Sequence, residues 1–283
     1  TVDCEDLVRG AEPNQVIATD NCDVPTITVE SDVISNYICA NQYTITRTYV
    51  ATDACGNYST ASQIIEVDDR MSPQITQIPN DETVSCSALV ADADPSLVLA
   101  NDNCDIPTIS VETDIISNYV CPNQYTITRT YVATDACGNT SSSSQIIQVD
   151  DQISPTIISI PLDELVSCEL NVSDPNTSEV ISNDNCESSP TISVLPDVIL
   201  NQICDNRYTM VRTYIATDEC GNTSSSTQTI TVYDETGPRI NSIPEDLIVS
   251  CESDIPETSV GLVQSEDECG GQPSISVEPD IIT

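Results

Sequence analysis

The sequence has no histidine, lysine, tryptophan or phenylalanine. Its 7 basic residues are all arginines and stand against 46 acidic residues, which gives a net charge of −39. A surface with this charge repels nucleic acids and anionic lipids, so both are poor partners and cations are favoured. Zinc is not expected, because histidine is absent and no two cysteines are spaced as CxxC.

Signals for catalysis are missing as well. No histidine or lysine is available as a general base, and no G-x-S-x-G nucleophile turn is present. Paired carboxylates could in principle hydrolyse glycosides. However, every candidate pair recurs along the chain, whereas an enzyme needs its site only once. We therefore expect that the protein is not an enzyme.

Long apolar runs are absent too. No stretch of 18 or more apolar residues occurs, so we expect no membrane insertion. The chain begins without a methionine or a signal-type hydrophobic segment. We expect either that such a segment has been removed or that the chain is an internal piece of a longer protein.

The 14 cysteines reveal a tandem repeat. Cys4, Cys86, Cys168 and Cys251 follow one another at intervals of 82, 82 and 83 residues, and the other cysteines keep the same period. The stretch NQYTITRTYVATDACGN occurs word for word at 41–57 and at 123–139. This spacing predicts four modules: 1–70, which lacks its first strand; 71–152; 153–235; and 236–283, which lacks its last strands.

The modules are predicted to be all-β. Residues 43–53 alternate apolar and polar side chains and are rich in β-branched and aromatic residues, which is typical of a strand. Further strands are predicted at 62–69, 72–79 and 107–116, and no segment has the period of an α-helix. Six or seven short strands in about 80 residues indicate an immunoglobulin-like β-sandwich. We expect the array to form an extended rod, completed by a longer chain or by strands from a neighbouring molecule.

Regular cysteines indicate disulfides and hence an extracellular or cell-surface location. Following the chain direction, the first and third cysteines of a module lie at its far end, and the second and fourth at its near end. A strand of eleven residues spans about 36 Å, too far for a disulfide to cross. The predicted pairs are Cys4–Cys39, Cys22–Cys55, Cys86–Cys121, Cys104–Cys137, Cys168–Cys204 and Cys186–Cys220. Cys251 and Cys269 would then pair outside this sequence; a scheme of neighbouring pairs, such as Cys4–Cys22 with Cys39–Cys55, is the alternative.

The same strand order brings acidic loops to the near end of each module, beside the linker from the module before. Uncompensated carboxylates repel one another, and a hard cation with oxygen ligands relieves this repulsion. The sequence therefore predicts calcium at the junctions, in preference to magnesium. The predicted ligands are Asp68, Asp69, Asp102, Asp105, Asp135 and Asn139 at the first junction; Asp150, Asp151, Asp184, Glu187, Asp218 and Asn222 at the second; Asp234, Glu235 and Asp267 at the third; and Asp20, Asp23, Asp53 and Asn57 in the first module.

Roles without a metal are also open to the residues of these loops. Asp and Asn can simply form Asx turns that satisfy nearby backbone amides. Asn57, Asn139, Asn171, Asn176 and Asn222 are also potential acceptors of N-linked glycans.

A repeated arginine (Arg47, Arg129, Arg212) occupies the same place in each long strand. It lies in phase with the core side chains of its strand. A buried guanidinium needs a charged or polar partner, so we expect a carboxylate or carbonyl beside it.

The combination YTITRTYVATDACGN, SQIIEVDD, SPQI and TVSC resembles the hyalin-repeat-like, immunoglobulin-like modules of large bacterial surface proteins. The resemblance covers the whole chain and implies a β-sandwich array in a secreted adhesin, stalk or extracellular fibre. We expect a structural role in such a fibre, stiffened by calcium and disulfides, with further copies of the module or chain as partners. An array of carbohydrate-binding or adhesive modules is the alternative, and exposed coplanar tyrosines would favour it.

Overall fold

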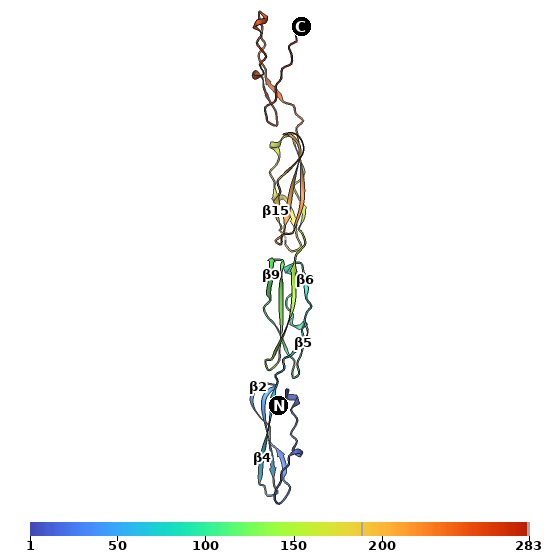
Figure 1. Cartoon of the computed structure of the whole chain (residues 1–283), viewed down its shortest axis with the longest axis vertical. Coiled ribbons are helices and arrows are strands. Elements are labelled where there is room, and N and C mark those ends of the chain that lie inside the picture. Colours follow the sequence, from blue (N-terminus) through green and yellow to red (C-terminus); the bar gives the residue numbers. More distant parts are fainter. Residues whose placement is uncertain (188, 282–283) are drawn as a thin grey trace. The chain divides into compact units, whose positions relative to one another are not determined.

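The computed structural model describes residues 1–187 and 189–281, and these residues form strands and short 3-10 helices but no α-helix. The chain divides into two compact units, Thr1–Asp151 and Gln152–Thr283 (Figure 1). Within the described residues, no helix is long and apolar enough to cross a membrane. The protein is thus a tandem array of all-β, disulfide-stapled modules.

The second module is the complete example in the first unit. Its main sheet has five strands in the order β6-β11-β10-β8, with β9 also paired to β10. β6 runs parallel to β11, whereas the other pairs are antiparallel. A second, two-stranded sheet joins β5 to β7. The bounds are β5 Gln74–Gln77, β6 Glu82–Val84, η3 Ser87–Leu89, η4 Pro95–Leu97, β7 Leu99–Asn101, β8 Thr108–Val111, β9 Ile115–Cys121, β10 Gln124–Thr134 and β11 Thr140–Asp150.

The β10–β11 hairpin carries the core of this module. Its strands pair without interruption from Gln124 opposite Asp150 to Thr134 opposite Thr140. Alternate side chains point inward, so that Ile127, Ile147 and Val149 form a buried apolar cluster. The serine and threonine residues between the inward positions are half-buried or exposed.

The first module has the same hairpin and lacks the small sheet. β3 pairs with β1, β2 and β4, and a single parallel bridge joins Val2 to Val67 where β6 lies in the second module. The bounds are η1 Glu5–Leu7, η2 Pro13–Gln15, β1 Thr26–Val29, β2 Val33–Cys39, β3 Gln42–Thr52 and β4 Tyr58–Asp68.

The second unit repeats this topology. Its main sheet has the order β13-β18-β17-β15 with β16 on β17, and two small sheets join β12 to β14 and β19 to β20. The bounds are β12 Thr156–Ser159, β13 Glu164–Val166, η5 Glu169–Asn171, η6 Thr177–Glu179, β14 Ile181–Asn183, β15 Thr191–Val194, β16 Val198–Cys204, β17 Arg207–Thr217, β18 Thr223–Tyr233, β19 Arg239–Ser242, η7 Glu252–Asp254, η8 Val260–Leu262 and β20 Gln264–Glu266.

The strands predicted from sequence are found with one change. The predicted strand at 107–116 is two strands, β8 and β9, which both pair with β10. The residues between them include Asp114, whose carboxylate binds the buried arginine of the module. Each sheet is built from strands that lie within one repeat of the sequence. The boundaries of the four modules stay a prediction.

The predicted partner of the buried arginine is found in all three modules that contain it. Arg129 donates through Nε and Nη2 to the two carboxylate oxygens of Asp114, at 3.1 and 2.9 Å, and through Nη1 to the carbonyl of Ala91 at 2.9 Å. Arg47 and Arg212 make the same carboxylate contacts with Asp32 and Asp197. The guanidinium therefore ties the segment before β9 to the middle of the main sheet.

Candidate metal centre at the module junction

The acidic loops of the second module are shaped by Asx turns. Asp102 accepts from the backbone N–H of Cys104 through Oδ2 at 2.9 Å, and Asp105 accepts from the N–H of Ala136 through Oδ2 at 3.0 Å. Asp69, just after β4 of the first module, accepts from the N–H of Met71 through Oδ1 at 3.1 Å. Each carboxylate thus uses one oxygen to fix a loop.

The other oxygen of each of these three carboxylates is buried without a hydrogen-bond partner. The atoms are Oδ2 of Asp69, Oδ1 of Asp102 and Oδ1 of Asp105. Ligand atoms of Asp69, Asp102 and Cys104 lie within 4.8 Å of one another. The sulfur of Cys104 is consumed in a disulfide, so the groups available to a cation at this point are oxygens. We call Asp69, Asp102, Asp105, Asp135 and Asn139 the first junction cluster.

Charge repulsion in this cluster shows in the pKa of Asp69. Burial raises this pKa above its usual range, and the neighbouring carboxylates of Asp102 and Asp135 raise it further, although the N–H of Met71 and the side chain of Asn103 act in the opposite direction. At an effective dielectric constant of 20, two carboxylates 4.8 Å apart repel by about 3.5 kcal/mol. The cluster is therefore costly without a counterion.

Asp135 and Asn139 close the third loop of the cluster. Oδ1 of Asp135 accepts from the N–H groups of Cys137 and Asn139, each at 2.8 Å, and Oδ2 accepts from the side-chain amide of Asn139 at 2.8 Å. Gly138 takes a φ of +90° in this turn, a conformation that favours glycine. The Asn139 amide also donates to the carbonyl of Asp69 at 3.2 Å, so the loop contacts the preceding module directly.

Two predicted ligands lie elsewhere. Asp68 accepts from Gln42 at 3.1 Å and forms an ion pair with Arg70 at 2.7 Å, and Asp150 likewise accepts from Gln124 at 3.1 Å. Successive side chains of a strand point to opposite faces, which places Asp68 and Asp69 on different sides. The sequence showed both acids together without a sign of which one turns toward the cluster.

The second unit contains an equivalent set of loops. Asp184 accepts from the N–H of Cys186 at 2.9 Å, and its Oδ1 is buried without a partner, as is Oε1 of Glu187. Burial raises the pKa of Glu187, and the charges of Glu219, Asp184 and Asp218 add to the effect. Asp218 binds Asn222 as Asp135 binds Asn139.

Glu219 is an acid that the sequence reasoning missed. It stands where the two other repeats have alanine, in ATDECGN instead of ATDACGN. This departure from the repeat was the feature of the sequence that could have identified Glu219 as a further acid of the loop. Its carboxylate adds to the negative charge around Glu187.

The remaining predicted ligands of the second unit and of the linkers differ in burial. Asp234 and Asp267 offer ligand atoms within 4.8 Å of each other and of Cys269, whose sulfur is bonded to Cys168. Glu235 is exposed. Asp151 is buried directly after β11, and its N–H donates to the carbonyl of Asn123 at 2.9 Å.

The first module forms the same turns around more exposed acids. Asp20 accepts from the N–H of Cys22 at 2.9 Å, and Asp23 from that of Ala54 at 3.3 Å. The side-chain amide and then the N–H of Asn57 lower the pKa of Asp53. Asp20, Asp23 and Asn57 are exposed, so these turns do not require burial of their side chains.

The disulfides correct the predicted pairing. Cys4 is bonded to Cys104 with their Cα atoms 5.1 Å apart, and Cys39 to Cys137 with Cα atoms 5.2 Å apart. The predicted pairs Cys4–Cys39 and Cys104–Cys137 are therefore wrong. Each of these cysteines lies at the end of its module that the sequence predicted. However, the far end of the first module faces the near end of the second, so the disulfides form across the junction between the two modules.

Two further predicted pairs, Cys168–Cys204 and Cys22–Cys55, are also wrong. Cys168 is bonded to Cys269, with Cα atoms 4.9 Å apart, instead of to Cys204, and Cys22, Cys55, Cys204 and Cys251 are free, exposed thiols. Cys86, Cys121, Cys186 and Cys220 are disulfide-bonded as well. The predicted pairs Cys86–Cys121 and Cys186–Cys220 stay predictions. The alternative scheme of neighbouring pairs is also wrong, because Cys4 is bonded to Cys104 and not to Cys22, and Cys39 to Cys137 and not to Cys55.

Comparisons with known proteins support the module type. Residues 74–149 match the family described as an HYR-like domain with 4 cysteines. No curated protein matches the sequence.

Solved structures of cadherins are similar over most of the chain but only weakly. A protocadherin gammaB7 EC3-6 structure is 14% identical, covers 87% of this chain and 77% of its own, and has a TM-score of 0.27. Drosophila N-cadherin EC1-4 is 15% identical over 90% of this chain and 78% of its own, with a TM-score of 0.24. These TM-scores are too low to carry an argument. The sheets, the four cysteines and the family match together support an HYR-like module at residues 74–149, within a tandem β array.

Proposed function

We propose that the chain is a structural segment of an extracellular fibre or adhesin stalk, whose module junctions are held by disulfides and stiffened by calcium. The observation that carries the proposal is the first junction. There, two disulfides join consecutive modules, and three buried carboxylate oxygens without partners belong to the loops beside them. Disulfides between modules favour an oxidising, extracellular location.

The donor set fits calcium in kind. Asp69, Asp102 and Asp105 would supply carboxylate oxygens that make no hydrogen bond. Calcium takes six to eight oxygen ligands in flexible geometry, whereas magnesium demands a strict octahedron and keeps its waters. A bound divalent cation would offset the carboxylate repulsion and fix the loops of the second module against the end of the first.

A thermal unfolding experiment tests calcium at the junctions. The whole chain is heated in about 10 mM CaCl2, in an equal concentration of MgCl2, and in EGTA. If the sites bind in the 0.1 mM range common for extracellular modules, calcium at 100 times its Kd contributes about 2.7 kcal/mol per site. We expect a clear rise of the melting temperature with calcium and a smaller one with magnesium. Equal melting temperatures in calcium and EGTA would contradict the proposal and leave the loops as Asx turns.

Carbohydrate binding has less support. Tyr37 stacks on Tyr43 with ring centroids 6.0 Å apart, but Tyr43 is buried and only Tyr37 is exposed. The Tyr119–Tyr125 pair repeats this stacking. A single exposed ring per pair is a small platform for a sugar, so we do not propose this function.

A further inference from the structure

One junction disulfide starts in the same turn as a predicted calcium ligand. The backbone N–H of Cys104 donates to Oδ2 of Asp102 at 2.9 Å, and the sulfur of Cys104 is bonded to Cys4 of the first module. The side-chain amide of Asn103 donates to the sulfurs of Cys104 and Cys4, at 2.9 and 3.4 Å. The disulfide therefore ties the loop that carries Asp102 to the end of the first module.

The other junction disulfide holds a second acidic loop in the same way. The N–H of Cys137 donates to Oδ1 of Asp135 at 2.8 Å, and the sulfur of Cys137 is bonded to Cys39. In the same loop, the side-chain amide of Asn139 donates to the carbonyl of Asp69 at 3.2 Å. Each disulfide thus ends two residues after an acid of the first junction cluster.

The first junction cluster takes its acids from both modules. Asp69 follows β4 of the first module, whereas Asp102 follows β7 of the second. Asp69 is 2% exposed and its Oδ2 has no hydrogen-bond partner, and the two carboxylates offer ligand atoms within 4.8 Å of each other. Two negative charges this close repel each other. The disulfides oppose this repulsion with covalent bonds, and a cation would oppose it with charge.

The second unit repeats the arrangement with other residues. The N–H of Cys269 donates to Oδ1 of Asp267 at 3.0 Å, and Cys269 is bonded to Cys168. Asp234 and Asp267 offer ligand atoms within 4.8 Å of each other. An acidic turn that is anchored by a disulfide is therefore a property of the repeat.

We propose that the Cys4–Cys104 disulfide is a redox switch for cation binding at the first junction cluster. The intact bond holds Asp102 beside Asp69, so that a calcium ion binds without the cost of first bringing the two charged loops together. Breaking the bond lets these loops separate and weakens calcium binding. This inference rests on the proposed calcium site.

The coupling acts in both directions. Because linkage between two equilibria is reciprocal, calcium protects the bond from reduction by the same factor by which the bond tightens calcium binding. The reductant is a dithiol, which supplies two electrons and two protons. The S–S bond breaks to give the thiols of Cys4 and Cys104, and the dithiol closes to a cyclic disulfide.

Two measurements on the native chain test the switch. Calorimetric titration with CaCl2 measures calcium binding to the oxidised protein and checks the calcium site on its own. The chain is then equilibrated at graded ratios of reduced to oxidised dithiothreitol, in about 10 mM CaCl2, in equal MgCl2 or in EGTA. Iodoacetamide traps the thiols, and peptide mass spectrometry gives the reduced fraction of Cys104. We expect half-reduction to need an about tenfold higher ratio in calcium than in EGTA, and a smaller increase in magnesium.

Matched variants measure the same factor through calcium affinity. Cys4→Ser combined with Cys104→Ser removes the bond and keeps the other junction disulfide. Calcium titration of this variant should show one site with about tenfold weaker affinity. Cys22→Ser combined with Cys55→Ser makes the same changes at exposed free thiols and should leave calcium affinity unchanged.

Two results would contradict the proposal in different ways. If calcium binds the native chain but half-reduction occurs at the same ratio in calcium and in EGTA, the switch is overturned and the calcium site stands. If calcium does not bind the native chain, the site is overturned and the switch with it. The reduction measurement needs no variant, so it decides the proposal even where the serine variant does not fold.

Discussion

At the scale of single residues, the repeat gives each group a partner at a fixed distance along the chain. The inward arginine and its aspartate are 15 residues apart in all three modules. The arginine was predictable from strand alternation, whereas the identity of the aspartate was not, because several acids precede each strand. The path of the segment before β2, β9 and β16 determines which aspartate reaches the arginine.

The Arg47–Asp32 pair predicts a pH effect. The hydrogen bond from Arg47 lowers the pKa of Asp32, although burial opposes this. A lowered pKa means that the pair contributes fully above the unfolded value of about 3.9 and is lost as the pH falls through the folded value. Asp32 is 35% exposed, so after solvent screening we expect Asp32→Asn to cost about 1 kcal/mol at pH 7.

Urea unfolding at about pH 7 and at about pH 3 checks this expectation. The difference between the variant and the parent should shrink markedly at the lower pH. Glu30→Gln changes an exposed acid near Asp32 in the sequence and should have no effect at either pH. A cost of Asp32→Asn that is equal at both pH values would show that the charge of Asp32 is not what stabilises the module.

The unpartnered oxygen of Asp102 predicts a specific loss of calcium response. Asp102→Asn keeps an oxygen for the N–H of Cys104 and removes one negative charge from the cluster. The calcium-induced rise in melting temperature should therefore shrink, while the melting temperature in EGTA rises slightly because repulsion is reduced. Asp20→Asn makes the same change in the exposed turn of the first module and should leave the calcium response intact. An equal loss in both variants would contradict the assignment of the cluster.

At the scale of elements, the long hairpin carries the buried apolar cluster of each module that contains it. The long strands were predictable because alternation persists over eleven residues, and the split of 107–116 was not, because its apolar pattern continues across the break. In the second module, residues 80 and 81 accept hydrogen bonds from Gln145 and Ile146 at the edge of this hairpin.

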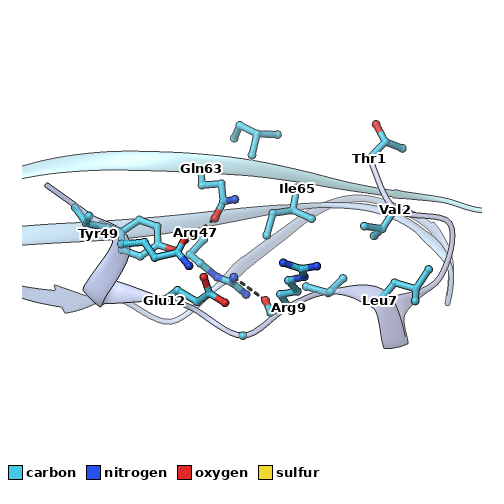
Figure 2. Close-up of a pocket in the computed structure, with 14 residues that line it drawn as sticks. Thr1, Val2, Leu7, Arg9, Glu12, Arg47, Tyr49, Gln63 and Ile65 are labelled. Atoms are coloured by element: carbon cyan, nitrogen blue, oxygen red, sulfur yellow. Dashed lines mark hydrogen bonds between the residues drawn. The ribbon is translucent and has the colours of Figure 1, made fainter.

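Ile147 and Ile65 occupy equivalent positions in the hairpins and differ in burial. Ile147 is fully buried, whereas Ile65, labelled in Figure 2, is half-buried. Ile147→Ala should cost about 2–5 kcal/mol, since it removes buried methyl groups and leaves a cavity. Ile65→Ala should cost clearly less. Hydrogen exchange of the strand amides, followed for each module separately, measures the two costs, and equal values would contradict the difference in burial.

At the scale of the whole molecule, the disulfides Cys4–Cys104 and Cys39–Cys137 connect one module to the next and do not lie within a single module. The sequence placed each of these cysteines at the correct end of its module, and the error arose from treating one module as a closed system. Modules of a tandem array share their ends, so a cysteine at the far end has a second candidate partner in the next module. Spacing within one period cannot distinguish these candidates.

Removal of one junction disulfide should be costly. The bond between Cys39 and Cys137 closes a loop with a sequence separation of 98, for which loop entropy gives about 4–5 kcal/mol. We expect this destabilisation for Cys39→Ser combined with Cys137→Ser in guanidinium unfolding. Cys22→Ser combined with Cys55→Ser removes two exposed free thiols and should change stability by less than about 0.5 kcal/mol. If the Cys22/Cys55 variant were instead the more destabilised of the two, the result would favour disulfides within modules.

Alkylation counts the free thiols directly. Native protein treated with iodoacetamide should gain labels on Cys22, Cys55, Cys204 and Cys251. The other 10 cysteines should react only after reduction. Peptide mass spectrometry identifies the labelled sites, and label on Cys4 or Cys137 in the native protein would contradict the junction bonds.

The two junction bonds of the first unit overlap along the sequence, since one spans Cys4 to Cys104 and the other Cys39 to Cys137. A single cut of the backbone anywhere between Cys4 and Cys137 is bridged by at least one of them. A protease that nicks a loop in this region therefore leaves the two pieces covalently attached, and the chain can still transmit a pull across the nick. Such redundancy lets the array keep its continuity in surroundings where a broken segment cannot be replaced.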